Sequence, residues 1–278
     1  MKTVPCPNIR HRRHYVTCIL QTQDPADRAV LLDLADGVVE AGQAYRRAAR
    51  AGRLYTIQPM VIPQAEKALL SKVYDKRMVA ANGSGRVTYD DLRDSLAICP
   101  YCNSGEVYEL DHFLPKGKFP EYNVIPINLV PICHPCNHIK LERAPEGRRE
   151  YFVHPYFDML PDDVQWLFAD LKRSSDGPVL TYRVDLDATV HGPLADRLAY
   201  QFRQLELDRR FKERSATMLV ELEAEIDEHL AAFDKDQMAN HFAELADRSL
   251  RLHGNTIETA AYLAASENEE YCAGGFRS

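Results

Sequence analysis

Two Cys-x-x-Cys pairs constrain the fold of this chain more than any other sequence feature. The pairs are Cys99 with Cys102 and Cys133 with Cys136, and thirty residues separate them. Each such turn places two thiolates about 3 to 4 Å apart, the spacing required by a tetrahedral zinc ion with Zn–S bonds of about 2.3 Å. Four thiolates leave no open coordination position, so we expect a structural zinc site.

The cellular compartment bears on how these cysteines are interpreted. Residues 1–22 lack the continuous apolar segment of a secretory signal, and no apolar run reaches the length of a membrane helix. We therefore expect a cytoplasmic, reducing location, where closely spaced cysteines are more often metal ligands than disulfide partners. A redox role would need a thioredoxin-like βαβ pattern, which the sequence lacks. Cys6, Cys18 and Cys272 have no ligand spacing, and we interpret them as ordinary cysteines.

Helical patterns flank the cysteine-rich segment. Asp24 and Pro25 predict the start of a helix that runs on through Val38, and a second helical pattern follows Pro63. A capping signal at residues 88–91 predicts a short helix before Cys99. After the cysteines we expect a helical patch around Trp166, a strand or hairpin arm within residues 179–190, and helices from Leu198 onward.

The predicted architecture is therefore α+β in three regions. A helical N-terminal region spans residues 1–87, a central zinc-supported module spans residues 88–158, and a mainly helical C-terminal region spans residues 159–278. Zinc pairs alone are equally consistent with a binding module and an enzyme. The functional prediction consequently depends on the residues that the two pairs enclose.

An adjacent Asp111 and His112 open the enclosed segment. Hydrolysis of a phosphodiester needs a base for the attacking water and a hard cation at the phosphate, and oxygen ligands suit Mg²⁺. Neighbouring side chains on an extended segment face opposite ways, so these two residues can serve different functions. Asn128 follows sixteen residues after His112, and Asn137 comes directly after the second cysteine pair.

This ordered set, from Cys99 to Lys140, resembles the HNH endonuclease family. The resemblance implies a ββα-metal module in which His112 is the general base and Asp111 and Asn137 bind Mg²⁺ or Mn²⁺. It also implies that Asn128 holds the hairpin loop and orients the base. Lys140, one helical turn after Asn137, is expected to reach a phosphate.

Several alternatives remain open at the level of sequence. His134 and His138 flank Asn137 and compete with it as metal ligands. Lys116 is a candidate nucleic-acid contact, but a basic rim that only keeps the protein soluble explains it equally well. The rival function is a zinc-dependent subunit that binds nucleic acid or protein and is active in, or only structural to, a larger complex.

A narrower resemblance adds the segment His154 to Asp158 and points to a bacterial HNH subgroup that includes the nuclease subunits of Septu-type anti-phage systems. This resemblance implies a role in defence and a partner ATPase. We expect DNA as the substrate, and the sequence leaves RNA open as the alternative. The net charge of −7 argues against a broadly basic nucleic-acid surface, so a local surface or the partner must provide one. The sequence has no Gly-rich phosphate loop of its own. For His154 and Asp158 we favour a structural role at the junction of regions over catalysis.

Overall fold

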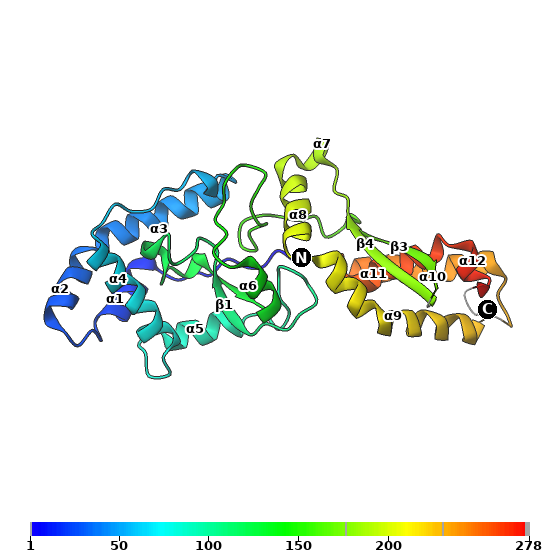
Figure 1. The fold of residues 1–278 in the computed structure, drawn as a ribbon, viewed down its shortest axis with the longest axis horizontal. Helices are drawn as coiled ribbons and strands as arrows, with labels where there is room; N and C mark the ends of the chain where they lie inside the picture. Colours follow the sequence, from blue (N-terminus) through cyan, green and yellow to red (C-terminus); the bar gives the residue numbers. More distant parts are fainter. Residues whose placement is uncertain (1, 176, 230, 276–278) are drawn as a thin grey trace. The chain divides into compact units, whose positions relative to one another are not determined.

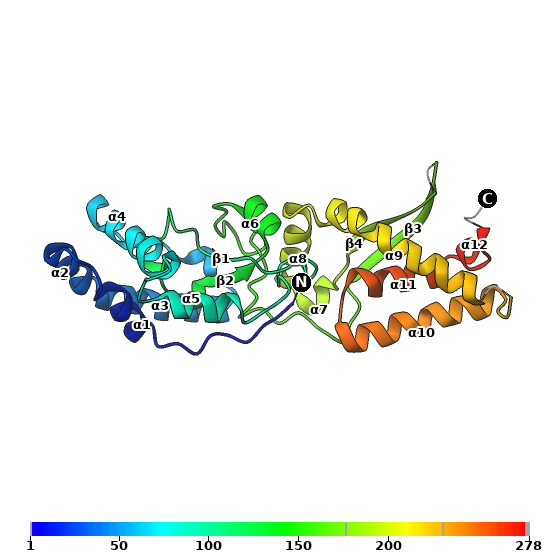
Figure 2. The ribbon, with the colours of Figure 1, turned by 90° about the horizontal axis from the view of Figure 1, so that it is seen from below.

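The computed structural model describes residues 2–175, 177–229 and 231–275, and its fold is α+β. The chain divides into two compact units, Met1–Met159 and Leu160–Ser278 (Figures 1 and 2). The predicted N-terminal region and the whole predicted central module, residues 88–158, therefore belong to the same unit. None of the helices in the described ranges is both long and apolar enough to cross a membrane.

The described part of the first unit combines α-helices with a two-stranded sheet. Its helices are α1 (His11–Ile19), α2 (Pro25–Asp33), α3 (Ala35–Arg50), α4 (Gln64–Val73), α5 (Arg86–Arg93) and α6 (His134–Lys140). Short 3₁₀ turns occur at Leu54–Thr56, Pro120–Tyr122 and Pro126–Asn128, and a π-helical turn spans Tyr74–Val79. Strands β1 (Glu109–His112) and β2 (Leu129–Ile132) are antiparallel, with Asp111 opposite Val130 and His112 opposite Leu129.

The local signals for helix starts are partly confirmed. The Asp24 side chain accepts hydrogen bonds from the amides of Ala26 and Asp27, so it caps α2 as predicted. The helix ends at Asp33, and α3 begins two residues later, so the predicted run to Val38 is split. The short helix before Cys99 is present, but the predicted cap at residues 88–91 is wrong, because Gly85 precedes its first turn.

The core of the first unit surrounds the connection between β1 and β2. Residues 119–133, which include two 3₁₀ turns and β2, are buried without interruption. Tyr45 of α3 is fully buried and hydrogen-bonds through its hydroxyl to Nε2 of His154 at 2.8 Å. The His154 ring stacks on Phe113 at a centroid distance of 4.1 Å. The helical part and the ends of the central module thus share one core.

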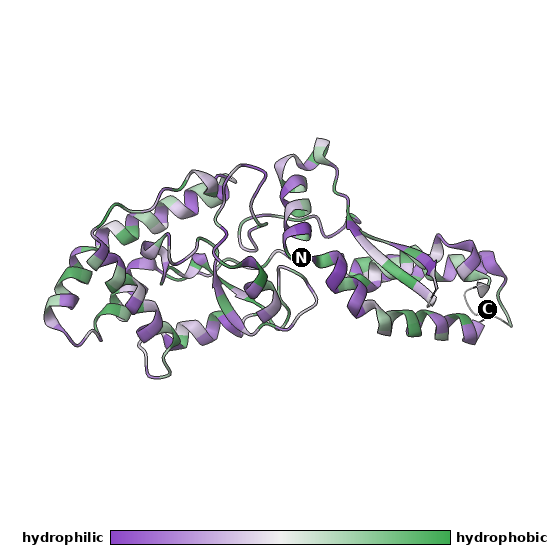
Figure 3. Ribbon diagram, viewed as in Figure 1, coloured by the Kyte–Doolittle hydropathy of each residue, from purple (hydrophilic) through white to green (hydrophobic). Residues whose placement is uncertain are grey.

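The second unit is a β-hairpin packed with helices. Strands β3 (Leu167–Ser174) and β4 (Gly177–Val184) pair antiparallel. The helices are α7 (Ala188–His191), α8 (Pro193–Gln204), α9 (Leu207–His229), α10 (Lys235–His253), α11 (Ile257–Ser266) and α12 (Glu269–Cys272). Helix α11 packs on β3 and α10, and α9 packs on β4. Hydrophobic and hydrophilic residues alternate along these helices, as expected where one face packs inward (Figure 3).

Two predictions for this unit have different outcomes. The strand or hairpin arm predicted within residues 179–190 is confirmed up to Val184, where β4 ends, but α7 begins at Ala188, so the last part of the prediction is wrong. The helical patch around Trp166 is wrong, because the residues that follow it form β3. Trp166 is nevertheless buried, with its indole N–H donating to the carbonyl of Pro161 and its amide donating to Oδ1 of Asn255. Tertiary packing therefore determines the extended conformation here.

Candidate active site and metal centre

Four cysteines form a buried group that could bind zinc. The Sγ atoms of Cys99, Cys102, Cys133 and Cys136 all lie within 4.8 Å of one another. The Sγ atoms of Cys102 and Cys133 are 3.8 Å apart, and a tetrahedral site with Zn–S bonds of about 2.3 Å requires an S–S separation of about 3.8 Å. The predicted convergence of the two pairs is thus present in the fold.

Gly105, in the turn after the first cysteine pair, lies close to the sulfur atoms of both pairs. Gly105 donates its amide hydrogen to Sγ of Cys102 at 3.3 Å. A Cβ atom at Gly105 would lie 3.0 Å from both Cβ and Sγ of Cys133. Hydrogen bonds to the thiolate of Cys102 from Cys133, Cys136 and Cys99 lower the pKa of Cys102, and the Gly105 amide acts in the same direction. The surroundings of Cys102 therefore favour its thiolate form, the form in which cysteine binds metal.

The other three cysteines lie outside this group. Cys18 is buried beside His14 and Met78, and the thiol of Cys272 donates to the carbonyl of Ala265. Cys6 is half-buried. None of them joins a cluster of potential metal ligands among the residues described.

Asn128 ties the two ends of the β1–β2 connection together. Its Oδ1 accepts from the Leu114 amide at 2.7 Å, and its Nδ2 donates to the Leu114 carbonyl at 3.1 Å. The Phe113 amide also donates to the Asn128 carbonyl at 2.8 Å. Because Asn128 is fully buried, its amide group replaces the hydrogen-bond partners that a regular strand would offer Leu114.

His112 is the last residue of β1 and is held by backbone and ring contacts. Its Nε2 lies 2.9 Å from the carbonyl oxygen of Asn123. A carbonyl only accepts, so Nε2 carries the hydrogen and Nδ1 keeps its lone pair. Burial lowers the pKa of His112 to about 3, against the opposing effect of the Asn123 hydrogen bond. The ring also meets Tyr74 edge to face, with centroids 4.4 Å apart. The imidazole is therefore neutral and restrained.

Asp111 is buried and forms an ion pair with Lys140. The ammonium nitrogen lies 2.9 Å from Oδ2 of Asp111 and donates to the His112 carbonyl at 3.1 Å. Burial raises the pKa of Asp111, and the positive charge of Lys140 opposes this shift. The prediction that Lys140 contacts a phosphate is wrong, because its side chain is only 1% exposed and is paired with Asp111. Its charge is directed at Asp111 and the end of β1.

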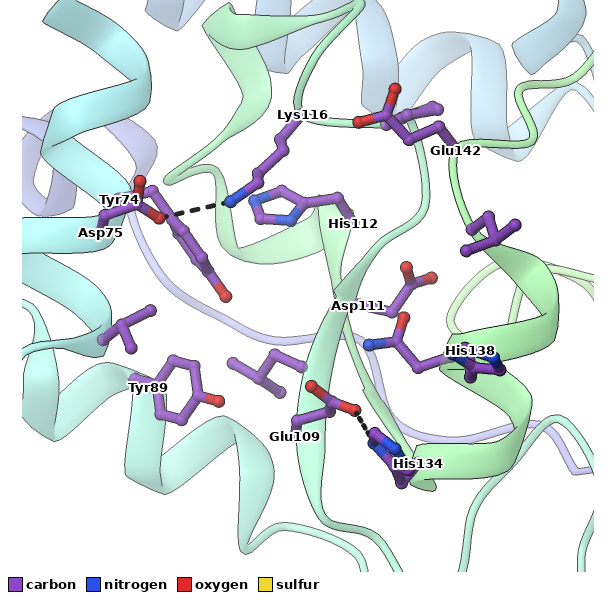
Figure 4. A pocket seen from close by; sticks show the side chains of 15 residues that line it. Tyr74, Asp75, Tyr89, Glu109, Asp111, His112, Lys116, His134, His138 and Glu142 are labelled. Carbon is purple, nitrogen blue, oxygen red and sulfur yellow. Dashed lines mark hydrogen bonds and ion pairs between the residues drawn. The ribbon is translucent and has the colours of Figure 1, made fainter.

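A cleft of about 540 Å³ lies beside β1 and α6, and most of the predicted site residues line it. Asp111, His112 and Asn137 all line it, together with Lys116. Figure 4 shows Asp111 and His112 on opposite sides of β1, as expected for neighbours on a strand. Lys116 is exposed and lies 3.3 Å from Oδ1 of Asp75 (Figure 4). Asn128, in contrast, does not line the cleft and acts through the backbone of the connection.

Further cleft residues come from the same strand and helix. Nδ1 of His134 lies 3.3 Å from Oε1 of Glu109 (Figure 4). His138 lines the cleft as well, and its ring stacks on that of His134. Glu109 was missed by the sequence interpretation, although its position two residues before Asp111 places both on one face of a strand. The two histidines therefore remain alternatives to Asn137 as metal ligands.

The N-terminal part of the chain contributes a wall that sequence spacing did not indicate. Tyr74, Asp75 and Tyr89 line the cleft, and the first two belong to the π-helical turn after α4. A π-helical turn often marks a functional position within a helix. These residues are separated from Asp111 and His112 by twenty or more positions, so only tertiary packing reveals them.

His154 and Asp158 do not line the cleft. The carboxylate of Asp158 accepts the His154 amide hydrogen at 2.7 Å. The His154 ring is hydrogen-bonded to Tyr45 and stacks on Phe113. Their contacts are those of packing residues inside the first unit, which agrees with the structural role favoured for them.

Comparisons with known proteins add one finding. No family model matches this chain, and no solved structure matches it. The chain is similar to a curated protein named "Protein ea31" of Escherichia phage lambda, with 30% identity over an alignment of 195 residues. The alignment covers 65% of this chain and 64% of that protein, so the chain spans less than two thirds of the relative's length.

Proposed function

We propose that this chain is a metal-dependent HNH endonuclease that hydrolyses phosphodiester bonds in nucleic acid. The observation that carries the proposal is the convergence of Asp111, His112 and Asn137, from β1 and α6, on one cleft. The four-cysteine group comes from the segments that precede β1 and begin α6. The two strands and the helix that follows them have the order expected of a ββα-metal module.

His112 is proposed to take a proton from the attacking water at Nδ1. The Asn123 carbonyl keeps the hydrogen on Nε2, so the lone pair of Nδ1 is available without a prior change of tautomer. As the water oxygen bonds to phosphorus, the bond from phosphorus to the leaving sugar oxygen breaks, and that oxygen takes a proton from solvent. Asn128 is a positioning residue, because it holds the backbone at Leu114, two residues after the base.

Asp111 and Asn137 are the proposed ligands of the catalytic Mg²⁺ or Mn²⁺. Both offer oxygen atoms, the donor type that hard divalent cations prefer, and both line the cleft. Bound there, the cation would neutralise charge that develops on the phosphate and the leaving oxygen. The ion pair of Lys140 involves Oδ2 of Asp111, so Oδ1 is the atom assigned to the metal.

The four cysteines are proposed to hold structural zinc. Cys99 and Cys102 lie before β1, whereas Cys133 and Cys136 lie at the start of α6. A zinc ion shared by both pairs would therefore hold β1 and α6 in the relation that brings Asp111 and Asn137 to one cleft. This function is separate from the chemistry of the cleft itself.

The substrate strand is proposed to pass Lys116 at the rim of the cleft. The Lys116 ammonium is near the Tyr74 ring, 5.7 Å from its centroid, and its Asp75 partner is exposed. An exposed pair of this kind exchanges partners easily, so the ammonium can approach a phosphate. DNA is the expected polymer, and a partner ATPase in anti-phage defence stays a prediction from the narrower resemblance.

The test is cleavage of supercoiled plasmid and of labelled RNA by the purified full chain with Mg²⁺ or Mn²⁺. His112→Ala should reduce cleavage at least about 100-fold, the usual contribution of a general base. EDTA should abolish cleavage. His253→Ala is the matched control, because His253 is exposed on α10 of the second unit, and it should cut at the wild-type rate.

The outcomes separate the proposals. Cleavage that is lost in His112→Ala and kept in His253→Ala supports the nuclease assignment, and the preferred substrate identifies DNA or RNA. Cleavage by His112→Ala at the wild-type rate would contradict the proposal that His112 is the general base. A folded, zinc-loaded wild type that cuts neither polymer would favour the alternative, a subunit that binds nucleic acid or protein within a larger complex.

A further inference from the structure

A second cluster of potential metal ligands belongs to the second unit, whereas the residues that line the cleft belong to the first. It consists of Glu225 and His229 of α9 with His241 of α10, and their ligand atoms all lie within 4.8 Å of one another. Glu225 and His229 are four residues apart, so they share one face of α9. His241 approaches the same carboxylate from α10. Each of the three is partly exposed, which leaves the group accessible to a dissolved ion.

Only one of the two imidazoles lies at hydrogen-bond distance from the Glu225 carboxylate. Nε2 of His241 is 2.8 Å from Oε2 of Glu225, and Nε2 of His229 is 3.7 Å from the same oxygen. The second separation exceeds a hydrogen bond, so hydrogen bonding explains the position of only one of the two rings. In a tetrahedral site with bonds of about 2.0 to 2.1 Å, neighbouring ligand atoms are separated by about 3.3 Å, between the two observed values.

Aromatic contacts hold both imidazoles in place. The His229 ring stacks on Phe233 with centroids 4.8 Å apart, and it meets the His241 ring edge to face at 4.9 Å. His241 also contacts Phe233, at 5.9 Å. Restrained rings lose little rotamer freedom when an ion binds, which favours binding.

Backbone hydrogen bonds connect the described residues on both sides of the cluster. His229 is the last residue of α9, and its carbonyl accepts the amide hydrogens of Ala232 and Phe233. Helix α10 then begins with a capping box formed by Asp234 and Gln237. Figure 2 shows α9 and α10 converging toward the connection between them. An ion at this point would join the two helices where they meet.

We propose that Glu225, His229 and His241 form a second metal site that binds Zn²⁺ through two imidazoles and one carboxylate. Two nitrogens and one oxygen are a common zinc donor set, whereas Mg²⁺ prefers oxygen ligands alone. Three protein ligands leave one position for water. The ion clips α9 to α10, and it needs neither the four cysteines nor any residue of the cleft.

The test measures zinc content and histidine resonances in the full chain. After dialysis against a fixed, low concentration of free Zn²⁺, the wild type should retain two zinc ions per chain, one for each group of ligands. Glu225→Gln and His241→Asn should retain one. The matched controls are Glu228→Gln and His253→Asn, exposed residues of the same two helices, and both should retain two. Circular dichroism checks that each variant is folded.

Nuclear magnetic resonance of the wild type provides a readout that needs no variant. The ring signals of His229 and His241 should shift together as Zn²⁺ is added, while that of His253 stays unchanged. A wild type that retains a single zinc ion and shows unmoved His229 and His241 signals would overturn the proposal. Retention of two ions by both Glu225→Gln and His241→Asn would overturn it as well, since the second ion would then lie elsewhere.

Discussion

The ammonium of Lys140 lies 2.9 Å from Oδ2 of Asp111, and the two side chains are 1% and 6% exposed. A buried charge that loses its partner is strongly destabilising, even where the intact pair contributes little net stability. The pair therefore couples α6 to β1 at the residue proposed to hold the catalytic cation.

Lys140→Met should lower the free energy of unfolding by about 3 kcal/mol, because Asp111 is left buried without a counter-charge. Adding Asp111→Asn should restore part of the loss, since the uncompensated charge is then removed. Denaturant titration of the two single variants and the double variant measures the coupling. Lys235→Met, which breaks an exposed pair with Glu269, is the control and should change stability little. Strict additivity of the two core substitutions would argue against the coupling.

Asn128→Ala should lower the free energy of unfolding by about 3 kcal/mol, because it removes partners from both the amide and the carbonyl of Leu114. We also expect slower cleavage, since the connection that follows His112 loosens. Urea unfolding monitored by circular dichroism measures the first effect. The exposed Asn82→Ala is the control. A loss no larger than that of Asn82→Ala would show that water replaces the side chain adequately.

Cys133→Ser should lose the zinc bound by the four-cysteine group and should unfold at a lower temperature, because structural zinc contributes directly to folding free energy. Elemental analysis and a thermal melt provide the two measurements. Cys6→Ser, outside the group, should retain both metal and melting temperature. Unchanged metal content at this group in Cys133→Ser would contradict the assignment of ligands.

Gly105→Ala should destabilise the chain by about 1 to 3 kcal/mol, the usual cost of overpacking a tight site. The new Cβ would lie 3.0 Å from Sγ of Cys133, so the cysteine must move before zinc binds. Competition with a chromophoric chelator measures zinc affinity. Gly147→Ala is a matched control, since nothing lies within 4 Å of a Cβ at that position. Equal zinc affinities in the two variants would contradict this prediction, because they would show that the turn at Gly105 accommodates a Cβ without loss of zinc-binding free energy.

His14 should make the protein sensitive to acid. Burial lowers its pKa from 6.5 to about 4, with the positive charge of His11 acting in the same direction. As the pH falls from 6.5 to 4, the unfolded chain takes up a proton at His14 and the folded chain does not. The free energy of unfolding should therefore fall by about 3 kcal/mol over this range, and the contribution of His14 should then level off.

The measurement is stability against pH in the wild type and in His14→Gln. The variant should show a shallower fall between pH 6.5 and 4, because glutamine does not titrate. His253→Gln, which removes an exposed histidine, should retain the wild-type slope. Identical slopes for His14→Gln and the wild type would assign the acid sensitivity to other groups.

Much of the candidate site could be predicted from sequence because its parts are short and local. The two cysteine pairs and the Asp111–His112 dipeptide each specify geometry within a few residues. The strand at β4 and the cap at Asp24 were predicted for the same reason. Trp166 was assigned wrongly because a short apolar stretch fits either a helix or a strand until its partner strand is known.

The direction of the Lys140 side chain could not be read from spacing. One helical turn after Asn137, a lysine can extend into solvent or turn back under the helix. In the fold it turns inward, because the buried Asp111 carboxylate and the His112 carbonyl offer it both charge and a hydrogen bond. The contact between Tyr74 and His112 is likewise decided by packing across distant parts of the chain.

The sequence by itself determined which residues are candidates for metal binding and catalysis and how they are spaced along short segments, because turns and strands follow local backbone geometry. Only the tertiary structure decided which of those groups are buried, which charge faces Asp111, and which residues wall the cleft. Burial and ion pairing depend on segments that meet across long stretches of chain, and so does the meeting of α9 and α10 at Glu225, His229 and His241.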